Sequence, residues 1–254
     1  MTAPAPDPTA TAVAWADIRQ VGFGTLDHAA AVAAATALLE LGPGFGDPLL
    51  AEVGLAGFTA QLGPDTYIDV LAPRSPDHPV ARWLRKAGGS SGWVLAVQVP
   101  SLAGVRERAA EAGVRVAVET TAMGHGIIQL HPQDAGGVLL ELDEFLPRDR
   151  WFWDDLPDAV AAREHLSTRA DDILAVDVAL ADPAAMARTW AAIIGTGPPA
   201  IDGDRAVLAF GTRIVRFVPG AGRDGIVAVE LHAINRETGA GQHGELCNTL
   251  IHFV

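Results

Sequence analysis

The sequence contains few cysteines, few lysines and no long apolar run, and each scarcity excludes a class of protein. Its single cysteine, Cys247, rules out an internal disulfide and a cysteine-cluster metal site, so a reducing cytoplasm is the expected location. No apolar run approaches the roughly 18–20 residues that cross a bilayer. Lys86 is the only lysine, and the formal net charge is −13. This balance argues against nucleic acid and against anionic membrane surfaces as partners.

Bulk composition predicts a globular chain with a loose beginning. Residues 1–17 are rich in Pro, Ala and Thr and have neither the basic nor the apolar segment of a secretory signal, so we expect a flexible N-terminal arm there. Hydrophobic residues make up 49% of the 254 residues and charged residues 19%. Such a chain can bury a substantial core and form one large domain or two of ordinary size.

A pattern of strand, helix and further strands recurs along the chain. Residues 18–42, 93–113 and 173–195 each open with an apolar strand and continue into an alanine-rich helix, and a fourth strand at 226–232 lacks a clear helix. Further strand candidates follow each of the first three openings. The pattern predicts an α+β fold of tandem βαβββ units, four in number with the last irregular. Two units can complete one curved sheet, so four predict two domains.

These units set the predicted domain boundaries. The first domain spans residues 18–145, residues 146–171 form a linker, and a second, shortened domain spans 172–254. We expect the aromatic stretch of the linker, "RWFWDD", to pack between the domains. Within the helices, Ser101 and Asp182 are the predicted N-caps, and Gly195 is the predicted end of the helix that Asp182 begins.

A carboxylate stands in an otherwise apolar strand near the end of the first predicted domain. Glu141 lies within "VLLEL", and a buried carboxylate must be paired, protonated or bound to a ligand. The surrounding residues 124–142, "GHGIIQLHPQDAGGVLLEL", and residues 75–92, "SPDHPVARWLRKAGGSSG", resemble the vicinal oxygen chelate (VOC) superfamily, which includes the glyoxalases. The first domain resembles methylmalonyl-CoA epimerase most closely, over about residues 18–144.

The resemblance implies a curved sheet that forms a cup around one divalent metal ion, to which the substrate's oxygens bind. Glu141 then occupies the place of the last metal ligand, while Gln20, Asp69 and Val94 occupy the others. Valine has no donor atom and a glutamine oxygen is a weak ligand for zinc-like metals, so we expect no metal and no other cofactor. If a divalent cation binds, Gln20, Asp69 and Glu141 would suit Mg²⁺ or Ca²⁺.

Roles for the residues of the cup follow from this resemblance. Glu141 and Asp69 are the candidate acid/base pair and His125 is a third catalytic candidate at the mouth of the cup, while the candidate substrate-binding residues are Gln20, Trp93 and Val94. Structural alternatives stay open: Glu141 could pair with an arginine, His125 could lie in solvent, and Gln20 could be an ordinary sheet residue.

Two groups of residues outside the cup could likewise be functional or structural. Arg82, Arg85 and Lys86 form a basic cluster that either contacts a diphosphate-bearing thioester or is a solvated helix face. Asp177 and His252 correspond to Gln20 and Glu141 in the second domain, but no full ligand set can be assembled there.

Three functions remain open. The first is a VOC-type isomerase or lyase that moves a proton next to the carbonyl of a small hydrophobic compound. The second is a metal-free protein that binds and sequesters a small molecule, and the third is a divalent-metal-dependent acyl-CoA epimerase. In each case the partner is a small molecule and the chain is a monomer or a homodimer. The sequence does not identify the substrate.

Overall fold

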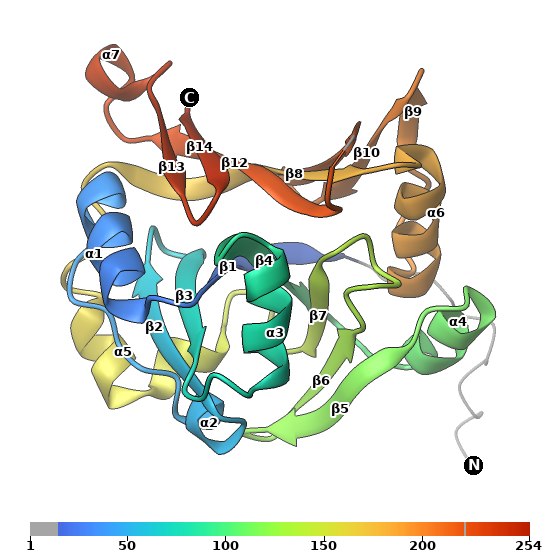
Figure 1. The fold of residues 1–254 in the computed structure, drawn as a ribbon, viewed down its shortest axis with the longest axis horizontal. Helices are drawn as coiled ribbons and strands as arrows, with labels where there is room; N and C mark the ends of the chain where they lie inside the picture. The colour runs from blue at the N-terminus through green and yellow to red at the C-terminus, as the bar shows by residue number, and fades with distance from the viewer. Residues whose placement is uncertain (1–14, 221) are drawn as a thin grey trace, which may run out of the picture.

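The protein has the predicted α+β fold, and its strands form one large, curved and unclosed sheet (Figure 1). The structure, a computed structural model, describes residues 15–220 and 222–254. Most of the arm predicted over residues 1–17 lies outside this range, and Asp17 already belongs to the first strand. Within the described ranges, no helix has the length and apolar character needed to cross a membrane.

The N-terminal half arranges its strands around a central antiparallel pair. Its elements are β1 (Asp17–Thr25), α1 (His28–Leu39), α2 (Pro48–Glu52), β2 (Leu55–Gln61), β3 (Tyr67–Pro73), α3 (Pro79–Lys86), β4 (Ser90–Val99), α4 (Val105–Glu111), β5 (Val116–Ala122), β6 (His125–Leu130) and β7 (Leu139–Glu144). The strands pair in the order β2-β3-β1-β4-β7-β6-β5. β1 and β4 are antiparallel, and each has a parallel neighbour on its outer side, β3 and β7.

The C-terminal half repeats this arrangement. Its elements are η1 (Phe152–Asp155), α5 (Pro157–Ala162), β8 (Ala170–Leu180), α6 (Pro183–Ile194), β9 (Ala200–Asp202), β10 (Arg205–Phe210), β11 (Arg213–Pro219), β12 (Gly225–Ala233), α7 (Arg236–Gly239), β13 (His243–Leu246) and β14 (Thr249–Phe253). The strands pair in the order β9-β10-β11-β8-β12-β14-β13. β8 and β12 form the central antiparallel pair, flanked by parallel β11 and β14. The helix of the last unit, α7, has only four residues.

Local sequence signals fix one of the two predicted helix starts. Asp182 caps α6 by accepting a hydrogen bond from the Ala185 N–H at 2.9 Å, and Gly195 ends the helix with φ 85°. The predictions of Asp182 as the N-cap and of Gly195 as the end of this helix are confirmed. Ser101 as an N-cap is wrong: its hydroxyl accepts from the Ala103 N–H in the preceding turn, and α4 begins later, after Gly104.

The two halves meet at the edge between β4 and β12. Gly92 of β4 is paired with Ile226 of β12, and its N–H donates to the Thr249 hydroxyl at 2.9 Å. One apolar core includes buried residues of both halves, such as Leu39 and Phe253. In Figure 1 the strands of the C-terminal half lie above the N-terminal half, with α1 and α6 near opposite ends of the contact, while α5 lies at the lower left beside the N-terminal half.

Replacing Gly92 with alanine should weaken this junction. A Cβ atom at this position would lie 2.8 Å from Ile226 Cβ and 2.9 Å from Thr249 Oγ1. We expect Gly92→Ala to cost about 1–3 kcal/mol, because neighbouring backbone must shift to admit the methyl group. The midpoint of urea unfolding measures the loss. Gly197→Ala, at a site with nothing within 4 Å of the new atom, is the control, and equal midpoints for both variants would contradict the expectation.

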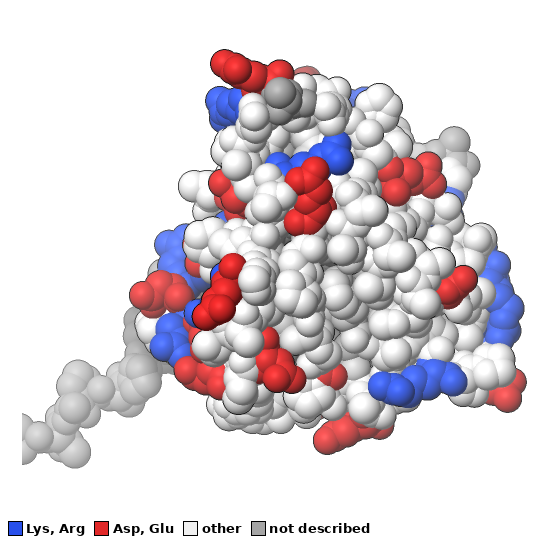
Figure 2. Space-filling view, turned by 90° about the vertical axis from the view of Figure 1, so that its left-hand side faces the viewer, with Lys and Arg blue, Asp and Glu red and all other residues white. Residues whose placement is uncertain are grey.

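Charged side chains are dispersed over the surface. On the face shown in Figure 2, acidic and basic side chains are interspersed, and broad uncharged areas lie between them. Most arginines of the described chain that form ion pairs do so at or near the surface, for example Arg115 with Asp134 at 2.6 Å. Exposed pairs of this kind contribute little to stability, so the fold depends mainly on its apolar core.

Candidate active site

A deep cavity lies on the inner side of the N-terminal half of the sheet. Its volume is about 1260 Å³, above the usual range of small-molecule sites, and its lining includes residues of β1, β3, β4, β6 and β7 together with α2 and α3. One wall is a buried apolar cluster of Leu55, Leu71, Trp93 and Val94. The rings of Trp83 and Trp93 contact each other along this wall, with centroids 5.6 Å apart and planes tilted by 34°.

Strand register brings three of the predicted site residues to the inner side of the cup. Gln20 on β1 is paired with Ala96 on β4, and Ala96 is paired with Glu141 on β7, so Gln20 and Glu141 lie in one row across the small side chain of Ala96. Asp69 on β3 is paired with Gly22, two residues along β1 from Gln20. Gln20, Asp69 and Glu141 all line the cavity.

Amide groups hold both carboxylates in place. Gln20 Nε2 donates to Asp69 Oδ2, and Gln129 Nε2 donates to Glu141 Oε2. Gln20 Oε1 in turn accepts from the indole N–H of Trp153 at 3.1 Å, which fixes the orientation of the amide. Asp69 Oδ1 is buried and has no hydrogen-bond partner among the described residues. An amide therefore restrains one oxygen of each carboxylate, and the other oxygen of Asp69 has no partner among the described residues that would compete for a proton.

Burial makes both carboxylates hold their protons more tightly. Burial, with smaller contributions from the negative charges of Asp47 and Glu141, raises the pKa of Asp69 to about 8. Burial also raises the pKa of Glu141, with a smaller contribution from Asp47. Asp69 is only 5% exposed, whereas Glu141 is partly exposed within the cavity that it lines. A carboxyl group whose pKa is near neutral can both take up and release a proton at physiological pH.

A third buried carboxylate, Asp143, lies two residues beyond Glu141 on β7. It is 0% exposed, and neither of its oxygens has a hydrogen-bond partner among the described residues. Burial, together with the charge of Glu141, raises the pKa of Asp143 well above its usual range. It is not part of the cavity lining, although strand alternation puts it on the same face of β7 as Glu141.

His125 does not join the carboxylates. It is absent from the cavity lining, and its ring stacks on Phe145 with centroids 3.7 Å apart. It meets Phe152, which does line the cavity, edge to face at 5.6 Å. His125 therefore lies behind an aromatic side chain of the cavity wall, and a direct proton transfer from it to substrate has no support in this geometry.

An aromatic segment, Trp151–Trp153, closes one side of the cavity. All three side chains are buried and line it. They pack in a cluster with residues of the N-terminal half, among them Phe45 and Tyr67. The expectation that this stretch packs between the two halves is wrong: its large rings fill the open side of the cup, where apolar surface is available.

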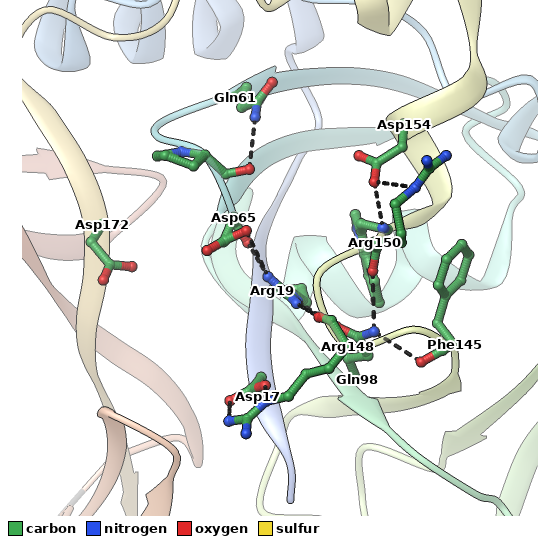
Figure 3. A network of polar contacts seen from close by, with 12 residues as sticks. Asp17, Arg19, Gln61, Asp65, Gln98, Phe145, Arg148, Arg150, Asp154 and Asp172 are labelled. Atoms are coloured by element: carbon green, nitrogen blue, oxygen red, sulfur yellow. Dashed lines mark hydrogen bonds and ion pairs between the residues drawn. The ribbon is translucent and has the colours of Figure 1, made fainter.

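Polar contacts hold the chain that leads into this aromatic segment (Figure 3). Arg19 Nε donates to Gln98 Oε1 at 2.6 Å, and Gln98 Nε2 donates to the carbonyl of Arg150 at 3.1 Å. Arg148 makes a two-point ion pair with Asp17, at 2.5 and 2.8 Å. Two-point pairs of this kind fix orientation as well as position. The network therefore places Trp153 where its indole can reach Gln20.

The residues of the cup do not fit the metal that the superfamily resemblance implies. No group of three or more His, Cys, Asp or Glu is placed to hold a metal ion within the part of the chain that the structure describes. Gln20 uses its amide oxygen for Trp153 and its amide nitrogen for Asp69, and Val94 supplies no donor atom. The two carboxylates alone would leave most coordination positions of a cation to water or substrate, so the chemistry of this site is not assigned to a metal.

The corresponding residues of the C-terminal half pair with one another. Arg216 contacts Asp177 at 2.6 Å and Glu230 at 2.9 Å, and Glu230 is paired in register with His252. One guanidinium group therefore bridges both carboxylates and offsets part of their charge. Asp177 therefore has the structural role of an ion-pair partner, and the geometry favours this role over a second catalytic cup.

Several site residues were missed at the sequence level. Asp143 had a signal, because a strand alternates its faces every two residues and Asp143 shares a face with Glu141. Gln129 in "IIQL" is also a polar residue in an apolar strand. Asp47 precedes a proline at a helix start and caps α2, which is a local signal for its position but not for its approach to the cup.

Comparison with known proteins supports the resemblance of the first domain. No family model matches the chain. The chain is 32% identical over 108 residues to the mitochondrial methylmalonyl-CoA epimerase of Bos taurus, a match covering 41% of this chain and 61% of that protein. It is 33% identical over 85 residues to the ethylmalonyl-CoA/methylmalonyl-CoA epimerase of Cereibacter sphaeroides, covering 32% of this chain and 63% of that protein.

These matches span less than two thirds of either relative's length, and they confirm the predicted similarity of the first domain to methylmalonyl-CoA epimerases. A solved structure of a hypothetical protein from Staphylococcus aureus covers 94% of this chain and 98% of its own, with a TM-score of 0.66 at 9% identity. This likeness concerns the fold alone, and it extends over both halves.

Proposed function

We propose that this protein is an isomerase of the epimerase type, which moves a proton at the carbon next to a carbonyl group with Asp69 and Glu141 as the proton carriers. The observation that carries the proposal is the pair of amide-held carboxylates with raised pKa values in one deep cavity. The relationship to methylmalonyl-CoA epimerases supports the reaction class and suggests an acyl thioester as substrate.

The pair can supply an acid and a base at the same time. Because the charge of Glu141 raises the pKa of Asp69, removing the first proton makes removal of the second harder. The singly protonated pair therefore persists around neutral pH. The ionised member takes the proton from the carbon and leaves an enolate, and the protonated member returns a proton to the same carbon. The two groups end with exchanged protonation states, which solvent resets between turnovers.

The walls of the cavity support this chemistry. Apolar side chains such as Trp93 and Val94 keep water away, and this strengthens hydrogen bonds to the enolate oxygen. Trp153 and Gln20 hold Asp69 so that its proton is presented from a fixed place. The carbonyl end of the substrate lies against the carboxylates in this proposal, and its apolar part lies along the tryptophan wall.

A binding protein that sequesters its ligand is the second candidate. The observation that favours it is the large apolar wall of the cavity, where the rings of Trp83 and Trp93 contact each other. Aromatic walls of this kind retain hydrophobic molecules without any chemistry. A metal-dependent acyl-CoA epimerase is the third, and the donor set of Gln20, Asp69 and Glu141 argues against it.

Hydrogen exchange at the substrate carbon distinguishes these functions. The chelator-treated protein is incubated with methylmalonyl-CoA in deuterium oxide, and mass spectrometry follows deuterium at the α-carbon against a protein-free control. The proposal predicts many exchanged substrate molecules for each protein molecule. Tight, stoichiometric binding without exchange would instead assign the protein to sequestration, and exchange that requires added metal would restore the metal-dependent epimerase.

A further inference from the structure

The cavity mouth receives a cation from the C-terminal half of the chain. Arg223, in the loop between β11 and β12, lines the cavity together with Lys86 at the end of α3. Arg223 lies outside residues 18–144, over which the epimerase-like motifs extend. The C-terminal half therefore contributes directly to the site of the N-terminal half.

Arg223 is held in a defined place at the mouth. Its Nη2 donates to the Ser91 hydroxyl at 2.6 Å, and its guanidinium lies 5.4 Å from the centre of the Trp83 ring. Trp83 contacts Trp93, the wall residue next to Val94, so a line of aromatic side chains runs from Arg223 into the cup. A guanidinium stacked on one face and bonded through one nitrogen still presents further N–H groups to a ligand.

The two cations at the mouth have no carboxylate partner. Within the described residues, no Asp or Glu forms an ion pair with Arg223 or with Lys86, although both side chains are exposed and many arginines elsewhere are paired. The neighbouring cations of α3 differ, because Arg82 and Arg85 donate to the carbonyls of Asp77 and Pro76. Lys86 alone of this basic cluster lines the cavity.

We infer that Arg223 and Lys86 bind an anionic group, a phosphate or a carboxylate, at the outer end of the substrate. The inference rests on the proposed function, since it concerns the same cavity. Electrostatics gives it a direction: the carboxylates Asp69 and Glu141 in the cup repel an anion, and the cations at the mouth attract it. An acyl thioester would therefore bind with its thioester carbonyl towards Asp69 and Glu141 and its anionic group towards the mouth.

Binding measurements with matched probes test this inference. Calorimetry compares the wild type with Arg223→Gln, Lys86→Gln and the conservative Arg223→Lys. Arg188→Gln, an exposed residue on α6, is the control that makes the same change in net charge. The probes are propionyl-CoA, which has phosphates but no free carboxylate, methylmalonyl-pantetheine, which has the carboxylate but no phosphate, and propionyl-pantetheine, which has neither.

We expect Arg223→Gln to weaken the binding of one anionic probe by about 10- to 100-fold, as loss of a charge-assisted hydrogen bond does. The probe whose binding is weakened identifies the anion. Weaker binding of propionyl-CoA would identify a phosphate, and weaker binding of methylmalonyl-pantetheine would identify a carboxylate. Arg223→Lys should recover part of the affinity, and the affinity for propionyl-pantetheine should not change. Equal affinities for Arg223→Gln and Arg188→Gln with both anionic probes would overturn the inference, as would a wild type that binds neither.

The α-proton exchange assay separates this inference from the proposed function. Exchange that persists in Arg223→Gln at saturating substrate, with unchanged affinity, overturns the anion site and leaves the isomerase intact. Affinity that depends on Arg223 without any exchange in the wild type supports the anion site and overturns the isomerase.

Discussion

Asp69→Asn and Glu141→Gln are each expected to lower the rate of α-proton exchange by about 100- to 10,000-fold, the usual contribution of a positioned acid or base. Both substitutions keep the size of the side chain and remove the exchangeable proton. The hydrogen bonds from Gln20 and Gln129 explain why the carboxylates are held, and the raised pKa values explain why they can move protons near neutrality. Mass spectrometry of deuterium uptake in the substrate measures the effect.

Glu52→Gln is the matched control, because Glu52 lines the same cavity from its exposed rim. Its exchange rate should stay within a few-fold of the wild type. The wild-type rate should also fall as pH rises through about 8, where Asp69 loses the proton that it must return. A rate that survives both Asp69→Asn and Glu141→Gln would show that these residues are not the proton carriers.

The protein should lose stability as the pH rises. The pKa values of Asp69, Glu141 and Asp143 are all raised in the folded state, so each group binds its proton more tightly when folded. Their stabilising contribution is complete below the unfolded-state pKa and is lost as pH rises through the folded-state values. For Asp69 the pKa rises from 3.8 to about 8, and each unit is worth about 1.4 kcal/mol. We expect the free energy of unfolding to fall by several kcal/mol over this range.

Asp143 should account for part of this loss, because both of its oxygens are buried without a partner. Asp143→Asn cannot ionise, so the plot of unfolding free energy against pH should be flatter for this variant than for the wild type. Denaturant unfolding at a series of pH values measures both slopes, and Asp77→Asn, at an exposed position, is the control. A wild-type stability that rises with pH, or identical slopes for Asp143→Asn and wild type, would contradict the account.

Strand alternation made much of the cup predictable from sequence. Glu141 stood out because it interrupts an apolar strand, and the family resemblance placed Gln20 and Asp69 on the strands beside it. Their inward direction follows from register alone, since each residue pairs with a neighbour that also faces the cup. The caps of α6 were predictable for a similar reason, because they depend on residues adjacent in sequence.

The remaining site residues depend on contacts between distant segments. Trp153 reaches Gln20 only because residues 146–155 fold back across the cup, and Arg223 reaches the mouth only because the C-terminal half docks there. Neither position has a sequence signal that names its partner. His125 shows the converse case: its place between two glycines suggested a side chain at the mouth of the cup or in solvent, yet its ring is stacked against Phe145.

The most direct test of the account is the exchange rate of chelator-treated wild-type protein whose metal content has been measured by inductively coupled plasma mass spectrometry. The account predicts that deuterium enters the α-carbon of methylmalonyl-CoA at an undiminished rate when zinc, cobalt, nickel and iron are far below stoichiometric. Near-stoichiometric metal, with exchange that is lost on chelation and restored by adding that metal, would contradict the assignment of the chemistry to Asp69 and Glu141 alone.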